Sequence, residues 1–152
     1  MKYIPFYFLL VLSTSLFSQQ FDFTNLVLMT KDIKTYEKNM FSIGNDTVEI
    51  TDYVSTFAEG YDSKKAEAMT WYSLYSFSGL AGENNIASGL DITFYGESDY
   101  SSILNQIIAY AEYVETKKEG TGYTSYYKYG LLITIETRKS EQGGFVGFIY
   151  RP

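Results

Sequence analysis

Residues 115–151 read ETKKEGTGYTSYYKYGLLITIETRKSEQGGFVGFIYR, and this stretch decides the class of fold. It holds segments rich in β-branched and aromatic residues, which favour strands. The predicted strands are 115–119, 123–127, 131–139 and 145–151. The loops that join them are short and contain glycine. Loops of this kind form hairpins, so we expect the four strands to be antiparallel neighbours.

The first half of the chain contains three more candidate strands. Residues 48–57 form one, although the apolar parity changes near Thr51 and Asp52, so we expect a bulge or a break there. Residues 66–78 are apolar at both parities, which is typical of a central strand covered on two sides. Residues 90–95 alternate between apolar and more polar side chains, which predicts a half-buried strand.

Two segments carry apolar residues at helical spacing. The first is 24–41, with a stripe of Leu26, Met29, Ile33, Tyr36 and Met40. The second is 99–114, with a stripe of Tyr100, Ile103, Leu104, Ile107, Ala111 and Val114. Thr24 or Asp22 is the expected N-cap of the first helix, and Ser98 or Asp99 that of the second.

Residues 1–20 read MKYIPFYFLLVLSTSLFSQQ, which is the pattern of a signal peptide. A lysine precedes an apolar region, and small residues follow it. We expect cleavage after Ser18, with Ser15 as the alternative, and export to the periplasm or the cell exterior. A transmembrane anchor is disfavoured because the apolar run is shorter than the roughly 20 residues that span a bilayer. No stable membrane anchor is expected after cleavage.

The remaining chain, 19–152, is predicted to form a single α+β domain. The order helix, then antiparallel meander, occurs twice, in units of about 22–96 and 97–152. A helix on one face of a meander buries that face. We therefore predict two tandem helix-plus-meander units, with the helices on one face of either a continuous sheet or two packed sheets.

This order of elements behind a signal peptide resembles that of small exported bacterial proteins of unknown function. At the level of architecture it also resembles the tandem-repeat β-lactamase-inhibitor-protein group. The residues that carry the resemblance are the two helix stripes, the strand 123–127, and the turn Lys128-Tyr129-Gly130 that leads into 131–135. The resemblance implies a fold, and it assigns no functional residue.

Composition argues against several kinds of partner and chemistry. The net charge is −6 and the 12 basic residues are scattered, so a nucleic-acid partner is not expected. The chain has no Cys and no His, which removes disulfides, thiolate nucleophiles, imidazole bases and the commonest metal ligands. An exported domain of this composition must be stabilised by packing alone, and aromatic residues make up 18% of it.

Carboxylates are the remaining candidates for catalysis. Asp46, Glu49 and Asp52 lie close together in the sequence, as do Glu97 and Asp99. A glycosidase needs two carboxyl groups about 5–10 Å apart across a groove. Acids at strand boundaries and helix starts more often have a structural role. We therefore predict no catalytic residue and a protein that is not an enzyme.

Metal and modification sites have only weak sequence support. Glu83-Asn84-Asn85 is the best calcium fragment, but it lacks the spaced Asp/Asn pattern of a dedicated loop. Gly79-Leu80-Ala81-Gly82 lacks the Lys-Ser/Thr that follows in a phosphate loop. Asn45-Asp46-Thr47 fits an N-glycosylation sequon, and Asp46-Thr47-Val48 is similar to bacterial O-glycan acceptors. We predict no metal ligand and no cofactor, and we leave glycan attachment open.

Tyrosine is the unusual feature, with 16 residues in 152. Tyrosine favours strands whatever its function, since its ring packs while its hydroxyl stays in water. A row that faces solvent can instead recognise a protein or a carbohydrate. The hypothetical binding surface comprises Trp71, Tyr72, Tyr75, Tyr123, Tyr126 and Tyr127.

The function predicted from these observations is that of a non-catalytic exported binding protein with an unknown protein or carbohydrate partner. Two alternatives stay open. One is a self-associating structural subunit of the envelope or matrix, which could pair through the apolar strand 145–150 if that strand lies at an edge of the sheet. The other is a small carboxylate-based glycan hydrolase.

Overall fold

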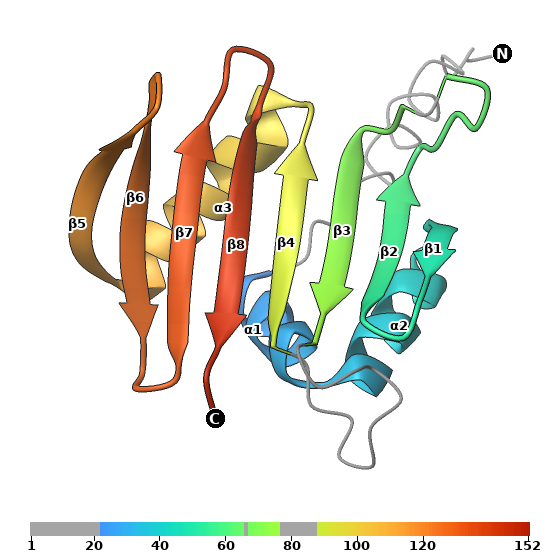
Figure 1. The fold of residues 1–152 in the computed structure, drawn as a ribbon, viewed down its shortest axis with the longest axis horizontal. Coiled ribbons are helices and arrows are strands. Elements are labelled where there is room, and N and C mark those ends of the chain that lie inside the picture. Colours follow the sequence, from blue (N-terminus) through green and yellow to red (C-terminus); the bar gives the residue numbers. More distant parts are fainter. Residues whose placement is uncertain (1–21, 66, 77–87) are drawn as a thin grey trace, which may run out of the picture.

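A computed structural model describes residues 22–65, 67–76 and 88–152, which form an α+β fold of two layers (Figure 1). The helices are α1 (Phe23–Lys31), α2 (Ile33–Ser42) and α3 (Glu97–Tyr110). The strands are β1 (Asp46–Ile50), β2 (Val54–Glu59), β3 (Thr70–Tyr75), β4 (Gly89–Phe94), β5 (Glu112–Glu119), β6 (Gly122–Tyr129), β7 (Ile133–Lys139) and β8 (Gly144–Tyr150). The expected signal peptide and the fragments 79–82 and 83–85 lie outside the described residues. Of the helices described, none has the length and apolar character needed to cross a membrane.

The eight strands form one continuous antiparallel sheet in the order β1-β2-β3-β4-β8-β7-β6-β5. Each half of the chain supplies four consecutive strands, as the tandem arrangement predicts. The halves join where β4 pairs with β8, with Leu90 opposite Phe148 and Ile92 opposite Val146. Of the two arrangements left open by the sequence, the structure therefore has the continuous sheet.

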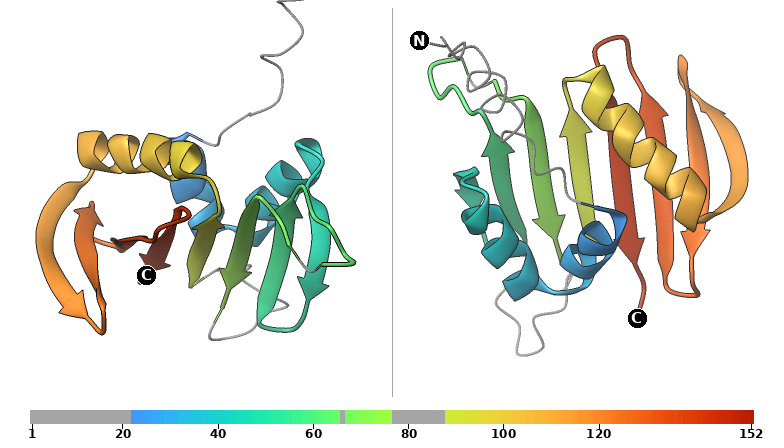
Figure 2. Two further views of the ribbon diagram at one scale, coloured as in Figure 1. Left: turned by 90° about the horizontal axis from the view of Figure 1, so that it is seen from above. Right: turned by 180° about the vertical axis from the view of Figure 1, so that it is seen from behind.

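All three helices lie on the same face of this sheet (Figure 2). Both α1 and α3 contact β4 and β8, so they cover the join between the two halves. The core lies between the layers, and its sheet side is formed by Phe57, Tyr72, Leu74, Leu90, Ile92, Ile135, Val146 and Phe148. None of the described helices lies on the opposite face, so within the described residues the helix layer covers β3 on one side. The expected cover on both sides of this strand is not found there.

Residues 24–41 were expected to form one helix, and the structure divides them at Asp32. The backbone of Asp32 is extended, with φ −134° and ψ 114°. Its carboxylate accepts hydrogen bonds from the backbone N–H of Lys34 at 3.1 Å and from the hydroxyl of Thr35 at 2.6 Å, and so caps α2. The apolar stripe continues across the break, with Met29, Ile33 and Tyr36 all buried. Periodicity alone therefore hides the division.

The helix predicted at 99–114 is α3, and it begins and ends earlier than its apolar stripe predicts. Its N-cap is Gly96, which makes no side-chain capping bond, so the expected cap at Ser98 or Asp99 is wrong. The chain leaves the helix at Ala111, and Val114 is an exposed residue of β5. The reason is that pairing of β5 with β6 already begins at Glu112, which competes with a further helical turn.

The expected break in 48–57 is confirmed. Thr51, Asp52 and Tyr53 form the turn between β1 and β2, and a register shift lies between Thr47 and Glu49. The hydroxyl of Thr51 accepts hydrogen bonds from the backbone N–H groups of Tyr53 and Val54, which closes the turn.

Candidate functional site

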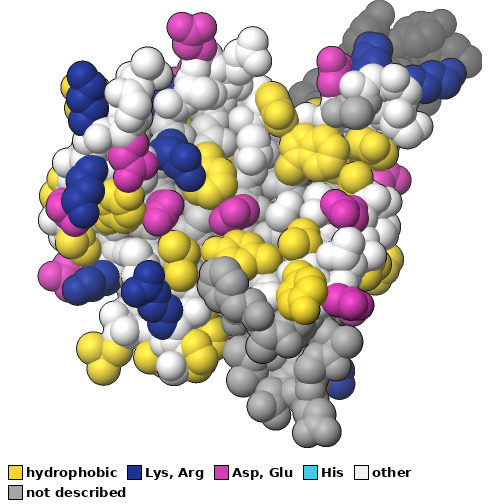
Figure 3. All heavy atoms as spheres, viewed as in Figure 1, with side chains coloured by type: hydrophobic (Ala, Val, Ile, Leu, Met, Phe, Trp, Pro, Cys, Tyr) yellow, Lys and Arg dark blue, Asp and Glu magenta, His cyan; other side chains and the backbone are white. Residues whose placement is uncertain are grey.

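The face of the sheet opposite the helices, called here the open face, is the candidate site. Side chains alternate along each strand, so every residue that follows a core residue points to this face. The register places Trp71, Thr93, Phe145 and Arg138 in one row across four strands, called the aromatic row. It places Ser73, Asp91, Gly147, Glu136 and Tyr126 in the next, called the acidic row. Figure 3 shows hydrophobic and acidic side chains interleaved across this face.

The aromatic row is held by contacts between its own side chains and their neighbours. Trp71 meets Tyr61 edge to face, with ring centroids 5.5 Å apart. The guanidinium carbon of Arg138 lies 4.3 Å from the centroid of the Phe145 ring, a cation–π contact. These contacts fix Trp71 and Phe145 while part of each ring stays exposed.

The acidic row contains a pair of carboxylates on either side of a glycine. Asp91 and Glu136 each lie opposite Gly147, so their strands are two spacings apart, about 9.5 Å. A side chain at 147 would crowd the site, because a Cβ there would lie 3.1 Å from Oδ1 of Asp91. Glycine therefore leaves the space between the two acids open.

Burial and like charge act together on Asp91. Burial, together with the negative charge of Glu136, raises the pKa of Asp91 to about 6, although the nearby charge of Arg138 opposes this rise. The ion pair between Arg138 and Glu136 is long, at 4.0 Å. Asp91 consequently changes its protonation state near neutral pH, in the middle of the open face.

Tyr75 lies on this face at the end of β3, and its side chain reaches toward β4. Its ring lies across Gly89, and a Cβ at 89 would collide with the phenol. Burial raises the pKa of Tyr75 to about 12, with smaller contributions from the charges of Asp91 and Glu136. The hydroxyl of Tyr75 therefore stays protonated near neutral pH beside the acidic pair.

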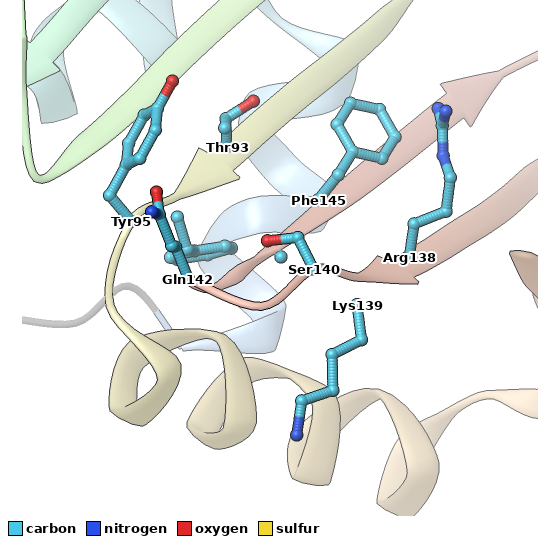
Figure 4. A pocket seen from close by; sticks show the side chains of 9 residues that line it. Thr93, Tyr95, Arg138, Lys139, Ser140, Gln142 and Phe145 are labelled. Carbon is cyan, nitrogen blue, oxygen red and sulfur yellow. The ribbon is translucent and has the colours of Figure 1, made fainter. Parts of the chain in front are cut away.

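Two cavities lie at one end of the open face. The first, of about 260 Å³, is lined by Thr93, Phe94, Tyr95, Arg138, Lys139, Ser140, Gln142, Gly144 and Phe145. Figure 4 shows Thr93 between the side chains of Tyr95 and Phe145, with Lys139 turned away toward α3. There Lys139 donates to Oε1 of Glu97. The second cavity, of about 300 Å³, is lined by Glu67, Ala68, Tyr95 and Gln142, so the two cavities share Tyr95 and Gln142.

The structure divides the six aromatic residues of the hypothetical surface. Trp71, Tyr75 and Tyr126 lie on the open face. Tyr72 and Tyr127 are buried in the core, 6% and 7% exposed. Tyr123 is 66% exposed, but it shares the parity of Tyr127 and so lies on the helix side of the sheet. The open face proposed below therefore leaves Tyr72, Tyr123 and Tyr127 out.

The two groups of acids selected from the sequence do not form a facing pair. Asp46 and Glu49 lie on the edge strand β1, and Asp52 lies in the turn after it. Glu97 and Asp99 lie in the first turn of α3, where the hydrogen bond from Lys139 holds the pKa of Glu97 below its usual range. Within residues 22–65, 67–76 and 88–152, no cluster of three or more acids could hold a metal ion.

The C-terminal strand is not a free edge. β8 lies between β4 and β7, so both of its sides are paired. The condition for self-association through 145–150, that this strand lies at an edge, is therefore not met. The edges of the sheet are β1 and β5, and β5 carries five charged residues and a register shift, features that oppose pairing with another chain.

Sequence reasoning missed the residues that the cavities bring together. Tyr95 and Phe145 lie in different halves of the chain and meet through the pairing of β4 with β8. Both residues have odd numbers, like Trp71, and this alternation was the available indication that they share its face of the sheet. It becomes informative only once the register between the two halves is known.

Comparisons with protein-family models, with curated proteins and with solved structures find no match to this chain. The resemblance to the β-lactamase-inhibitor-protein group stays a prediction.

Proposed function

We propose that the protein is a non-catalytic binding protein that is exported and recognises a carbohydrate or protein partner with the open face of its sheet. The observation that carries the proposal is the aromatic row next to the acidic row, on the face of the sheet opposite the three described helices. Binding sites combine apolar and aromatic contact area with a few polar groups that fix orientation. The rings of Trp71 and Phe145 supply the first, and Asp91, Glu136 and Arg138 supply the second.

Export is tested together with binding. The protein is expressed with residues 1–18 in a bacterial host and recovered from the periplasm and the medium. Intact mass of the recovered protein is expected to correspond to cleavage after Ser18. Protein that stays in the cytoplasm with residues 1–18 attached contradicts this part of the proposal.

Binding is tested with the recovered protein immobilised and exposed to envelope extract and to soluble glycans. The variant Trp71→Ala/Tyr75→Ala is expected to lose the captured partner. The matched control Tyr53→Ala/Tyr123→Ala removes two tyrosines that are 58% and 66% exposed and lie off the open face. Capture that is equal in both variants, or absent in the unchanged protein, contradicts the proposal.

The pair Asp91 and Glu136 favours one second candidate, a glycan hydrolase. A carboxyl group with a raised pKa next to a second carboxyl group is an arrangement found in glycosidases. Against it, neither acid lines the two cavities described above. Release of reducing ends from a bound glycan, abolished in Asp91→Asn, would establish the hydrolase. Binding without release supports the binding protein.

A further inference from the structure

We infer that the space between Tyr95 and Phe145 is a slot for one ring of a neutral oligosaccharide, and that the next ring lies on the other side of Tyr95. The inference rests on the proposed function and names the ligand class of the open face.

Tyr95 and Phe145 line the same cavity, which has a volume of about 260 Å³. Phe145 lies directly opposite Thr93, and Tyr95 is the first residue after β4, two residues further along the chain from Thr93. A sugar ring that packs against an aromatic side chain makes contact at about 3.5–4 Å. The first cavity lies at this position, with Thr93 between the two rings (Figure 4).

Both cations at the slot are engaged elsewhere. Lys139 forms its ion pair with Glu97 on α3, away from the slot. Arg138 stacks on the Phe145 ring and pairs with Glu136. An anionic ligand would have to compete for these groups, whereas a neutral ligand leaves both pairs intact.

The polar groups that remain at the slot are neutral. They are the hydroxyls of Thr93 and Ser140 and the amide of Gln142. In the described part of the chain, none of these three side chains has a hydrogen-bond partner. Hydroxyl and amide groups both donate and accept, so they match the hydroxyl groups of a sugar.

The second cavity extends the site by one ring. Because it shares Tyr95 and Gln142 with the first, the two cavities adjoin at these two residues. Tyr95 is 54% exposed, as a ring with ligand space beside it must be. Glu67 supplies an acceptor in this second cavity. A chain of two or more sugars is therefore expected to bind more tightly than one sugar.

The slot is already formed without a ligand, which lowers the cost of binding. Arg138 holds one face of Phe145, and the same ring lies against Gly147, where a Cβ would be 3.1 Å from its Cε1 and Cζ atoms. The backbone of Tyr95 is fixed by its N–H, which donates to the carbonyl of Met69 at 2.9 Å. Binding does not have to order either backbone.

The test uses isothermal titration with defined probes: the monomer, dimer and tetramer of β-1,4-glucan, β-1,3-glucan, β-1,4-mannan, β-1,4-xylan and chitin, and a trigalacturonate as the acidic probe. At least one neutral series is expected to bind, with an affinity that rises tenfold or more from monomer to tetramer. Tyr95→Ala and Phe145→Ala are each expected to weaken the tetramer at least tenfold, and the control Tyr123→Ala to leave it unchanged. If Phe145→Ala does not fold, Gln142→Ala replaces it, because Gln142 is exposed and lines both cavities.

Four outcomes overturn the inference: no neutral series binds, the trigalacturonate binds in preference, the tetramer is no tighter than the monomer, or Tyr95→Ala binds as well as the unchanged protein. Capture of a protein partner that depends on Trp71 and Tyr75, without binding of any glycan, overturns this inference and leaves the proposed function standing. If the unchanged protein binds neither a glycan nor a protein partner, both this inference and the proposed function are refuted.

Discussion

Replacing Asp91 by asparagine is expected to stabilise the protein at pH 7.5 and to have little effect near pH 4. Asp91 lies partly buried at the centre of the open face and titrates at about 6 rather than at its ordinary pKa of 3.8. Between these two values the native state holds a proton that the unfolded chain has lost. The free energy of unfolding therefore falls as the pH rises through this window. Asparagine does not titrate, so the free energy of unfolding of the variant does not fall in this pH window for this reason.

The magnitude follows from the same two values. A rise in pKa from 3.8 to about 6 corresponds to an upper limit of about 3 kcal/mol, at about 1.4 kcal/mol per pH unit. Solvent reaches part of the carboxylate and Arg138 lies near it, so the expected gain for Asp91→Asn is about 1–2 kcal/mol at pH 7.5. In a domain of this size that is a rise in melting temperature of about 3–8 °C.

Urea unfolding of the unchanged protein and of Asp91→Asn at five pH values from 4 to 8 measures the effect. The difference between the two is expected to grow between pH 4 and pH 6 and to be constant above it. Asp52→Asn, at an exposed turn, controls for the loss of one negative charge. A stability difference that is independent of pH, or a variant less stable than the unchanged protein at pH 7.5, would refute the reasoning. The expected effect depends on the positions of Glu136, Tyr75 and Arg138 near Asp91.

Three further predictions concern stability and are checked by denaturant unfolding. Tyr36→Phe is expected to lower the free energy of unfolding by about 1–2 kcal/mol, because the buried hydroxyl of Tyr36 donates to two backbone carbonyls of the sheet, each at 2.9 Å. An unchanged denaturant midpoint contradicts this. Gly143→Ala is expected to lower the free energy of unfolding by about 3 kcal/mol or more, since its Cβ would collide with the carbonyl oxygen of Phe94. Gly120→Ala, at a φ of 60° with open space around it, should lower it by about 1 kcal/mol; equal losses refute the collision. Asp32→Ala is expected to lower the free energy of unfolding by about 1 kcal/mol and to weaken the helical signal in circular dichroism, because it removes the N-cap of α2. A variant with unchanged stability and an unchanged helical signal would contradict this.

Local chemistry was sufficient for most of the elements. The hairpin turns in the second half contain glycines such as Gly120 and Gly130 with positive φ, and each joins the two strands that the sequence predicts. The stripe Tyr100, Ile103 and Ile107 is buried as its spacing predicts. These features depend on interactions within a few residues of one another, which is why the sequence reveals them.

The site depends on pairing between distant parts of the chain, which the sequence does not reveal. Trp71 and Tyr72 are adjacent and similar in character, yet one lies on the open face and the other in the core. Only the register decides between them, since one step along a strand reverses the face. In the same way, Thr93 meets Phe145 only because β4 pairs with β8, and no local pattern predicts this pairing.

The pairing of β4 with β8 also dictates when the protein can be completed. Of the described strands, β8 is the last to be synthesised, yet it lies in the middle of the sheet between strands that are made before it. Until residues 144–150 arrive, β4 and β7 each present an unpaired edge, the condition in which chains associate wrongly. The sheet of the first half is therefore complete only after the second half has been made. A chain truncated before residue 144 is expected to aggregate rather than to form a smaller folded domain.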